Sequence, residues 1–371
     1  MGSRVEHSLL SIAPLLLAAF AARAQATPSQ SPPATQGTLS GAIVGRVTVK
    51  DGASPLAYSV ASIESLGRER FADEQGEFHF VDLPAGPLRI RVRHVGYVPV
   101  DVPVTVRGGI VDTVNVALTH IAVRLSTVQV RGYPECKNPG APAMADDSAF
   151  ATVFDQLRQN ADQYRLLTNE YPFTFAVERM MATATYGGQI RTERVDTLSL
   201  ASVNQWKYKP GAVVTSEGRL FHRSFILNLP TLVSFADTTF IANHCFYNGG
   251  LETVDGTELL RIDFIAASRI RDPDVDGAMY LDPTSFQIRR SLLHLSKIPR
   301  GVNGLAEVDV TTLFGELFPS VPVIAAVSSV NEFTTNRPRF DTPVRGLEEQ
   351  RLIAVNFLKS RPGDSRKKPK P

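Results

Sequence analysis

Short strand patterns separated by turns constrain the first third of this sequence more than any other feature. Between residues 42 and 118, apolar and polar residues alternate over short runs, and turn-forming residues such as Gly, Pro and Asp recur about every ten positions. Alternation with a period of two is typical of a strand that buries one face. The expected strands lie at residues 42–49, 60–63, 77–80, 88–93, 98–106 and 110–118. Strands this short and regular predict a small β-sandwich.

Two details of this region predict local structure. Gly76 ends the turn that begins at Asp73, and we expect it to adopt the positive φ that other residues resist. Arg89, Arg91 and Arg93 alternate with apolar residues along one strand. This pattern predicts a core-facing side and a row of arginines that faces water.

The same residues carry motifs that resemble the carboxypeptidase regulatory-like family. The motifs are Gly45-Arg46-Val47, Asp73-x-x-Gly76-x-Phe78-x-Phe80-x-x-Leu83-x-x-Gly86 and Val92-Arg93-His94-Val95-Gly96-Tyr97. That family has a transthyretin-like sandwich and occurs beside zinc carboxypeptidases and at the front of TonB-dependent outer-membrane receptors. The resemblance covers residues 42–119 and implies a non-catalytic module. It also implies structural roles for the motif residues: Gly76 and Gly86 form turns, while Phe78, Phe80 and Tyr97 fill the core.

The N-terminus predicts export from the cytoplasm. Arg4 supplies a positive charge, Leu9–Ala22 form an apolar stretch, and Ala24-Gln25-Ala26 offers a small-x-small cleavage pattern. The stretch is short for a segment that crosses about 30 Å of hydrocarbon, although a retained membrane anchor is the alternative. We therefore expect a signal peptide at residues 1–26, a flexible spacer at 27–41, and a periplasmic or outer-membrane-associated protein with no transmembrane segment in the mature chain.

Two cysteines, Cys136 and Cys245, are the only ones in the sequence. In an oxidising compartment such a pair can be bridged, and two free thiols are the alternative.

Residues 120–147 are expected to form a strand and a Pro-rich linker. Residues 125–132 are similar to the short strand that leads from this kind of module into the plug domain of a receptor. A receptor would continue with a plug and a barrel of several hundred residues, and the remaining chain is too short for both.

Residues 148–358 predict an α+β domain. Apolar residues recur at spacings of three and four from Phe150 to Leu167, which indicates an amphipathic helix, and Asp146, Asp147 and Ser148 precede it as capping candidates. Strand patterns then follow at residues 173–179, 192–199, 240–246, 259–264, 277–282, 288–295 and 305–312, with a turn expected at Asn248-Gly249-Gly250 and strand or loop at residues 314–324. One helix followed by an antiparallel sheet gives the predicted fold class, which is mostly β.

Residues 277–288 also faintly resemble the half-barrel of LolA-like periplasmic lipoprotein carriers. Such half-barrels expose a concave apolar face that can hold an acyl chain. The resemblance covers about 50 residues and its motif is loose.

The motif search predicts no catalytic residue, no cofactor and no metal ligand. Asp272–Gly277 copies the opening of a calcium loop, but Pro283 stands where the bidentate carboxylate belongs. The histidines lack a Glu at zinc-peptidase spacing, and no nucleophile elbow or phosphate loop is present. An active site assembled from residues that are distant in sequence is the alternative, since a motif search does not address it.

Trp206 and Tyr208 alternate along an expected strand and are the weak candidates for ligand binding, because aromatic faces suit sugar rings. Their alternative is a core or rim aromatic pair. The formal net charge is +2, which indicates no attraction to nucleic acid. Residues 359–371 predict a basic disordered tail.

These observations favour a non-catalytic binding or scaffolding protein of the cell envelope, with a lipid, a glycan or an envelope protein as its partner. The alternatives are an accessory of a TonB-dependent outer-membrane system, and a carbohydrate-binding protein or hydrolase related to carboxypeptidases.

Overall fold

The computed structural model describes residues 39–123, 125, 135–203, 206–217, 224–299, 304–336 and 339–358. The expected signal peptide, most of the spacer, nearly all of the strand expected at 125–132 and the basic tail lie outside these residues. No helix in the described part of the chain is both long and apolar enough to cross a membrane.

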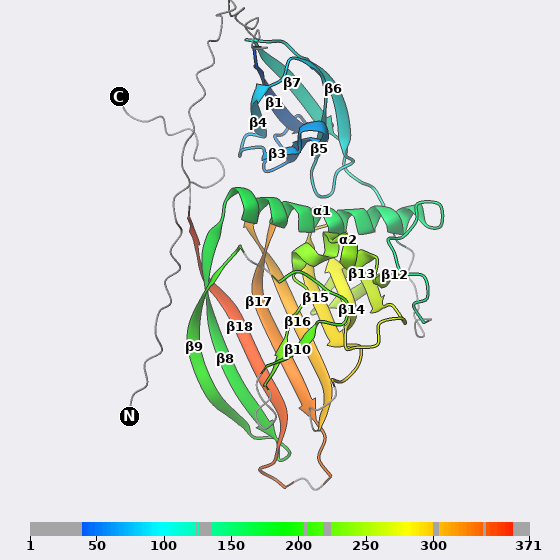
Figure 1. Ribbon diagram of the computed structural model, residues 1–371, viewed down its shortest axis with the longest axis vertical. Coiled ribbons are helices and arrows are strands. Elements are labelled where there is room, and N and C mark those ends of the chain that lie inside the picture. Colours follow the sequence, from blue (N-terminus) through cyan, green and yellow to red (C-terminus); the bar gives the residue numbers. More distant parts are fainter. Residues whose placement is uncertain are drawn as a thin grey trace, which may run out of the picture. The chain divides into compact units, whose positions relative to one another are not determined.

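The first folded region is a sandwich of two small sheets (Figure 1). One sheet has the order β4-β1-β7 and the other β3-β2-β5-β6. The strands are β1 (Gly41–Val49), β2 (Val60–Ile63), β3 (Arg68–Phe71), β4 (Glu77–Leu83), β5 (Gly86–Arg93), β6 (Val100–Val106) and β7 (Val111–Leu118), with a short 3₁₀ helix, η1 (Glu64–Leu66), after β2. Side chains from both sheets share one core, so the six predicted strands and the sandwich are confirmed.

Glycines of this region serve turns and close packing. Gly76 and Gly86 have positive φ, as predicted for turn positions. Gly45 has a different role, because a Cβ at this position would lie 2.0 Å from the ring of Phe78. Phe78 is fully buried, so its ring occupies the space that any larger residue at position 45 would need.

The row of arginines on β5 does not face water along its whole length. Arg93 lies 2.8 Å from Glu69 of β3, and the other oxygen of Glu69 accepts a hydrogen bond from Arg165 at 2.9 Å. Burial works to raise the pKa of Glu69, and the hydrogen bonds and charges of the two arginines lower it below the ordinary value. The prediction was wrong for Arg93 because the chain beyond residue 147 covers that end of the strand.

The predicted amphipathic helix is α1 (Ser148–Glu170). Asp147 is its N-cap, since its side chain accepts a hydrogen bond from the backbone N–H of Phe150 at 2.9 Å. The predicted apolar stripe is buried, and Asn160 adds a buried polar anchor. Its side chain donates to the Phe286 carbonyl at 2.9 Å and accepts from the Ile288 N–H at 3.0 Å, which fixes the helix to the turn before β15.

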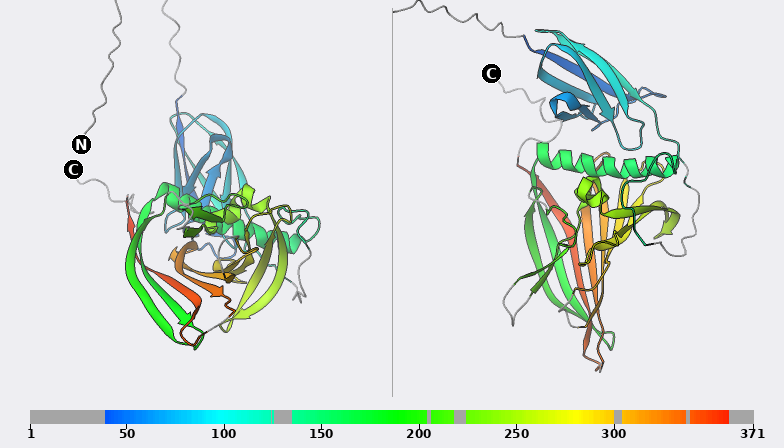
Figure 2. Two further views of the ribbon diagram at one scale, coloured as in Figure 1. Left: turned by 60° about the horizontal axis from the view of Figure 1, so that its bottom comes forward. Right: turned by 45° about the vertical axis from the view of Figure 1, so that its right-hand side comes forward.

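A nine-stranded antiparallel sheet follows α1, with the order β12-β13-β14-β15-β16-β17-β18-β8-β9. Its strands are β8 (Phe173–Thr185), β9 (Ile190–Ala201), β12 (His244–Val254), β13 (Thr257–Ala266), β14 (Val275–Leu281), β15 (Ile288–Leu295), β16 (Leu305–Phe318), β17 (Val321–Phe333) and β18 (Pro343–Phe357). Figure 2 shows that the sheet is strongly curved. One face, called the inner face below, carries the side chains that form a core with α1.

Three short elements accompany this sheet. They are the hairpin of β10 (Val214–Glu217) and β11 (Ser224–Leu227), the 3₁₀ helix η2 (Leu232–Ala236) and the helix α2 (Thr238–Ile241). The mostly β fold with one main helix and a large antiparallel sheet is therefore confirmed.

Three local predictions in this region were wrong. Residues 240–241 belong to α2 rather than to a strand, because Asp237 caps a helical turn there. Asn248-Gly249-Gly250 lies within β12, where the extra residue makes a bulge against β13 instead of a chain reversal. Residues 206–208 have no strand partner in the described part of the chain.

Cys136 and Cys245 are joined by a disulfide with a Cα–Cα distance of 5.6 Å. The same segment forms a bridge in which Gly140 donates to the His244 carbonyl at 3.0 Å. Ser268 also donates its backbone N–H to the Cys136 carbonyl, at 2.9 Å. These contacts attach the chain before α1 to β12, at one end of the large sheet.

Candidate functional site

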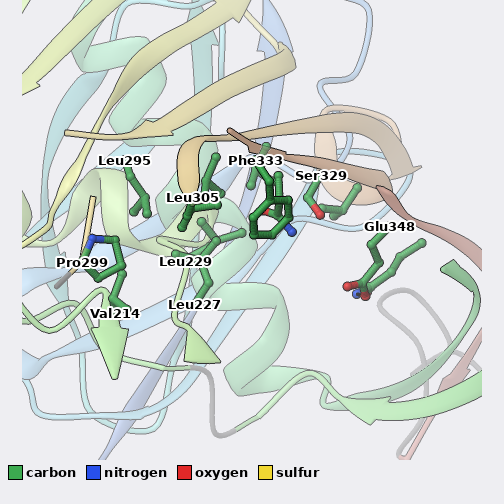
Figure 3. Close-up of a pocket in the computed structure, with 14 residues that line it drawn as sticks. Val214, Leu227, Leu229, Leu295, Pro299, Leu305, Ser329, Phe333 and Glu348 are labelled. Carbon is green, nitrogen blue, oxygen red and sulfur yellow. Dashed lines mark hydrogen bonds between the residues drawn. The ribbon is translucent and has the colours of Figure 1, made fainter. Parts of the chain in front are cut away.

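A cavity of about 500 Å³ lies against the inner face of the large sheet (Figure 3). Its walls come from the β10–β11 hairpin and the loop after it, from β15 and the loop after it, and from β16, β17 and β18. The lining residues are Val214, Leu227, Leu229, Leu295, Pro299, Leu305, Val308, Val310, Val327, Ser329, Asn331, Phe333, Glu348 and Gln350. A concave site of this size with mostly apolar walls and a few polar groups is typical of small-molecule binding. We call it the main cavity.

Strand register places the lining side chains on one face. Val327 of β17 is opposite Thr312 of β16 and Gln350 of β18, and Gln350 is in turn opposite Arg179 of β8. Directly paired residues of neighbouring strands point to the same side of a sheet, so this row crosses the inner face.

A second, smaller cavity of about 170 Å³ adjoins the main cavity, with which it shares Val327 and Gln350. We call it the side cavity. Its remaining lining comes from α1, β8, β9, β17 and β18 and is apolar or aromatic: Tyr164, Phe173, Phe175, Val177, Leu200, Val323, Ile324, Ala325, Ala326 and Leu352. The two cavities are therefore neighbours on the inner face, and the side cavity is the one that α1 helps to line.

The polar lining of the main cavity comes from two neighbouring strands. Ser329 and Asn331 are on β17, and Glu348 and Gln350 are on β18. The Gln350 side chain donates to Glu348 Oε1 at 2.8 Å. In Figure 3, Glu348 lies at the opposite end of the cavity from Val214 and Pro299, so the apolar and polar parts of the wall are separated.

An ion pair lies on β8 and β9 beside this polar edge. Arg179 donates to both oxygens of Asp196, at 2.9 and 2.8 Å. The hydrogen bonds from Arg179 lower the pKa of Asp196, and the same bonds raise the pKa of Arg179. Asp196 also contacts Arg194 at 2.6 Å, so one carboxylate is shared by two arginines.

The predicted ligand-binding pair, Trp206 and Tyr208, lines a different cavity of about 570 Å³. Trp206 is partly buried, and its ring packs edge-on against Tyr208 at 6.1 Å. Tyr208 is 4% exposed, and its hydroxyl donates to Asp274 Oδ2 at 2.8 Å. Burial and the neighbouring Asp274 raise the pKa of Tyr208. Tyr208 thus anchors the core, while Trp206 forms part of an accessible wall.

Asp274 lies at the centre of a buried polar cluster. Besides Tyr208, the backbone N–H groups of Gly211 and Val275 donate to it, at 3.0 and 2.9 Å. His244 Nε2 lies 3.6 Å from Oδ1. Burial acts to raise the pKa of Asp274, and these donors outweigh it, so the pKa is lowered.

His244 makes two further contacts within the core. Nδ1 lies 2.8 Å from the Phe240 carbonyl oxygen, and Nε2 lies 3.1 Å from the Val275 carbonyl oxygen. Together with Asp274, these contacts fix the orientation of the buried imidazole ring.

The calcium-like segment, residues 272–277, makes structural contacts in this protein. Asp274 is committed to the buried cluster, and Asp276 accepts the backbone N–H of Ala266 at 2.7 Å. Burial raises the pKa of Asp276. Within the described residues, no group of three or more His, Cys, Asp or Glu side chains could hold a metal ion.

The residues that line the main and side cavities were not among the sequence candidates. Leu227, Val327 and Gln350 come from strands that are remote in sequence, and each resembles an ordinary core or surface residue when taken alone.

Comparisons with known proteins agree with part of the sequence analysis. Residues 42–119 match the family model of the Carboxypeptidase regulatory-like domain, which confirms the predicted resemblance over the same residues. No curated protein matches the sequence.

Several solved structures are weakly similar to this chain. A candidate outer membrane lipoprotein-sorting protein domain from Vibrio parahaemolyticus is 10% identical, with a TM-score of 0.28, and the match covers 56% of this chain and 94% of that one. A LolA superfamily protein from Nitrosomonas europaea is 8% identical, with a TM-score of 0.27 and the same coverage of 56% and 94%. A candidate carbohydrate binding protein from Bacteroides uniformis is 9% identical, with a TM-score of 0.21 and coverage of 70% and 100%.

Proposed function

We propose that this protein is a non-catalytic binding protein of the cell envelope that holds the apolar part of a lipid or similar amphiphile. The ligand occupies the main and side cavities. The observation that supports this most is that the two cavities are neighbours on the inner face, since Val327 and Gln350 line both.

The size and lining of the site suit a chain-like ligand better than a compact polar one. The main cavity lies within the range of about 300–1,000 Å³ that small-molecule sites occupy. Its walls are supplied mainly by Val and Leu side chains, and burying an apolar chain against them removes apolar surface from water.

The signal peptide that the sequence predicts at residues 1–26 supports a location in the envelope. In that location the carboxypeptidase regulatory-like domain contributes a structural module, and its glycines and aromatic residues are used for turns and packing. The Cys136–Cys245 disulfide is consistent with an oxidising compartment.

A direct binding assay tests the proposal. The affinity of the exported protein for a fluorescent long-chain fatty-acid analogue is measured by titration. The same affinity is then measured for the variants Val327→Glu and Val327→Trp. Glu places a charge between the two cavities, and Trp fills the same space without a charge; each is expected to weaken binding about tenfold or more.

Ser328→Glu is the matched control, because Ser328 is the exposed neighbour of Val327 and points away from the inner face. It should bind like the unaltered protein. If the unaltered protein fails to bind any long-chain probe, or if both Val327 variants bind as well as Ser328→Glu, the proposal is wrong.

A glycan is the second candidate ligand, and its site is the cavity beside Trp206. The partly buried indole forms one wall there, with Asn169 and Thr231 nearby as polar groups. Trp206→Ala should then weaken retention on immobilised envelope polysaccharide, and equal retention of both proteins would exclude this candidate.

A further inference from the structure

The polar side chains of the main cavity are gathered at one edge of an otherwise apolar site. Ser329, Asn331, Glu348 and Gln350 all belong to β17 and β18, while the β10–β11 hairpin, β15 and β16 contribute apolar groups. The side cavity beneath α1 has Gln350 as the one polar amide in its lining. The polar edge therefore adjoins the apolar side cavity through Gln350 and lies across the main cavity from the apolar walls at Val214 and Pro299.

Glu348 gives this polar edge a negative charge. It is the one acidic or basic residue among the fourteen described residues that line the main cavity. No Lys or Arg in the described part of the chain forms an ion pair with it, and its recorded partner is the neutral side chain of Gln350 at 2.8 Å.

The nearest relevant cation is already engaged. Arg179 lies on β8 opposite Gln350 and interacts electrostatically with Glu348, but its guanidinium donates two hydrogen bonds to Asp196. Asp196 is shared with Arg194, and neither arginine lines the main cavity, so Glu348 is the charged side chain that a ligand in this cavity contacts directly.

We infer that the site selects amphiphiles by the charge of their head groups, and that it favours a cationic head over an anionic one. The tail lies toward the side cavity beneath α1, and the head lies beside Glu348 and Gln350. An amine head gains a charge-assisted hydrogen bond to Glu348, whereas a phosphate, sulfate or carboxylate head is repelled by it. The affinity for an amphiphile with an uncharged hydroxyl head lies between these two. This inference rests on the proposed function, because it assigns the ligand class of that same site.

Displacement titrations with three probes of equal tail length test the inference. The full exported protein is loaded with an uncharged fluorescent dye, and dodecylamine, dodecanol and dodecyl phosphate are compared as displacers below their micelle-forming concentrations. Dodecylamine is expected to bind about tenfold more tightly than dodecyl phosphate, as a single unscreened charge at several ångströms would give.

Substitutions at Glu348 then locate the origin of the preference. Glu348→Gln keeps the size and hydrogen-bonding capacity of the side chain. It should reduce the ratio of the affinities for dodecylamine and dodecyl phosphate to about one. Glu348→Lys should reverse it. Glu349→Gln is the matched control, because Glu349 is the next residue on β18, faces away from the inner side and pairs with Arg351 at 2.9 Å. This control should keep the original ratio.

Salt provides a further readout of a charge effect. Raising the ionic strength should shrink the preference in the unaltered protein and leave Glu348→Gln unchanged. If all three probes bind, but with the same ratio in the unaltered protein and in Glu348→Gln, the head-group inference is overturned and the lipid-binding function stands. If no probe binds to any variant, the proposed function itself fails.

Discussion

Replacing Asp274 by asparagine should destabilise the protein strongly, although the two side chains have nearly the same shape. Asp274 accepts hydrogen bonds from the Tyr208 hydroxyl and from two backbone N–H groups, and His244 lies 3.6 Å away. Each oxygen of the carboxylate faces donors. In either orientation, the NH₂ group of asparagine would therefore point at groups that also donate.

The size of the effect follows from burial and charge. Asp274 is fully buried, and a buried polar group left without its hydrogen bond costs about 1–3 kcal/mol. Hydrogen bonds to a charged group contribute about 1.5–3 kcal/mol each, so the loss of two of the three that Asp274 accepts amounts to about 3 kcal/mol or more. We expect Asp274→Asn to lower the free energy of unfolding by about 3–5 kcal/mol.

Urea unfolding at neutral pH measures this change. Trp206 is the single tryptophan of the chain and packs against Tyr208, so its fluorescence reports on the cluster, while circular dichroism reports on the whole sheet. Asp272→Asn is the control, since Asp272 is exposed two residues away, and it should change stability by less than about 0.5 kcal/mol. A loss below about 1 kcal/mol in Asp274→Asn would refute the charged-cluster argument.

The pH dependence has a defined sign. The pKa of Asp274 is lower in the folded protein than in the unfolded chain, where it is about 3.9. Its contribution is therefore complete above that value and is lost as the pH falls toward the folded pKa. The stability gap between the unaltered protein and Asp274→Asn should narrow below about pH 4, and a gap that widens on acidification would contradict the assignment.

Two further predictions concern packing and covalent linkage. Replacing Cys136 and Cys245 together by serine opens a loop with a sequence separation of 109 and should lower the free energy of unfolding by up to about 4.7 kcal/mol, measured by urea titration against the disulfide-bonded protein. Gly45→Ala places a Cβ against the ring of Phe78 and should cost about 1–3 kcal/mol, whereas Gly52→Ala, with open space around it, should be near neutral in the same thermal-melting assay. Equal melting temperatures for the two glycine variants would contradict the packing argument.

The sequence was informative where structure depends on local patterns. Six strands of the sandwich and the helix α1 were predicted closely because alternation, turn glycines and an N-cap are all encoded within a few residues, whereas β3 was not predicted. The expected strand at 240–246 failed partly because the cap at Asp237 outweighed the strand tendency of Phe240 and Ile241.

The candidate site was beyond this kind of reasoning for a physical reason. Gln350 and Arg179 face each other across neighbouring strands although they are far apart in the chain. Their proximity depends on which strand pairs with which, and single-strand patterns carry no such information. Trp206 and Tyr208 were found as a pair because they are local, but Tyr208 belongs to the buried cluster around Asp274.

A sheet that curves without closing keeps two outermost strands, and in this chain they differ in how well they are protected against copies of the same protein. Along β12, the segment around Gly140 and the disulfide to Cys245 occupy part of the outer side. Along β9, Arg191, Glu193, Arg194 and Asp196 intersperse charges of both signs, and charged side chains discourage edge-to-edge polymerisation. Conditions that reduce the disulfide and also screen these charges would therefore remove both protections at once and favour growth into fibrils.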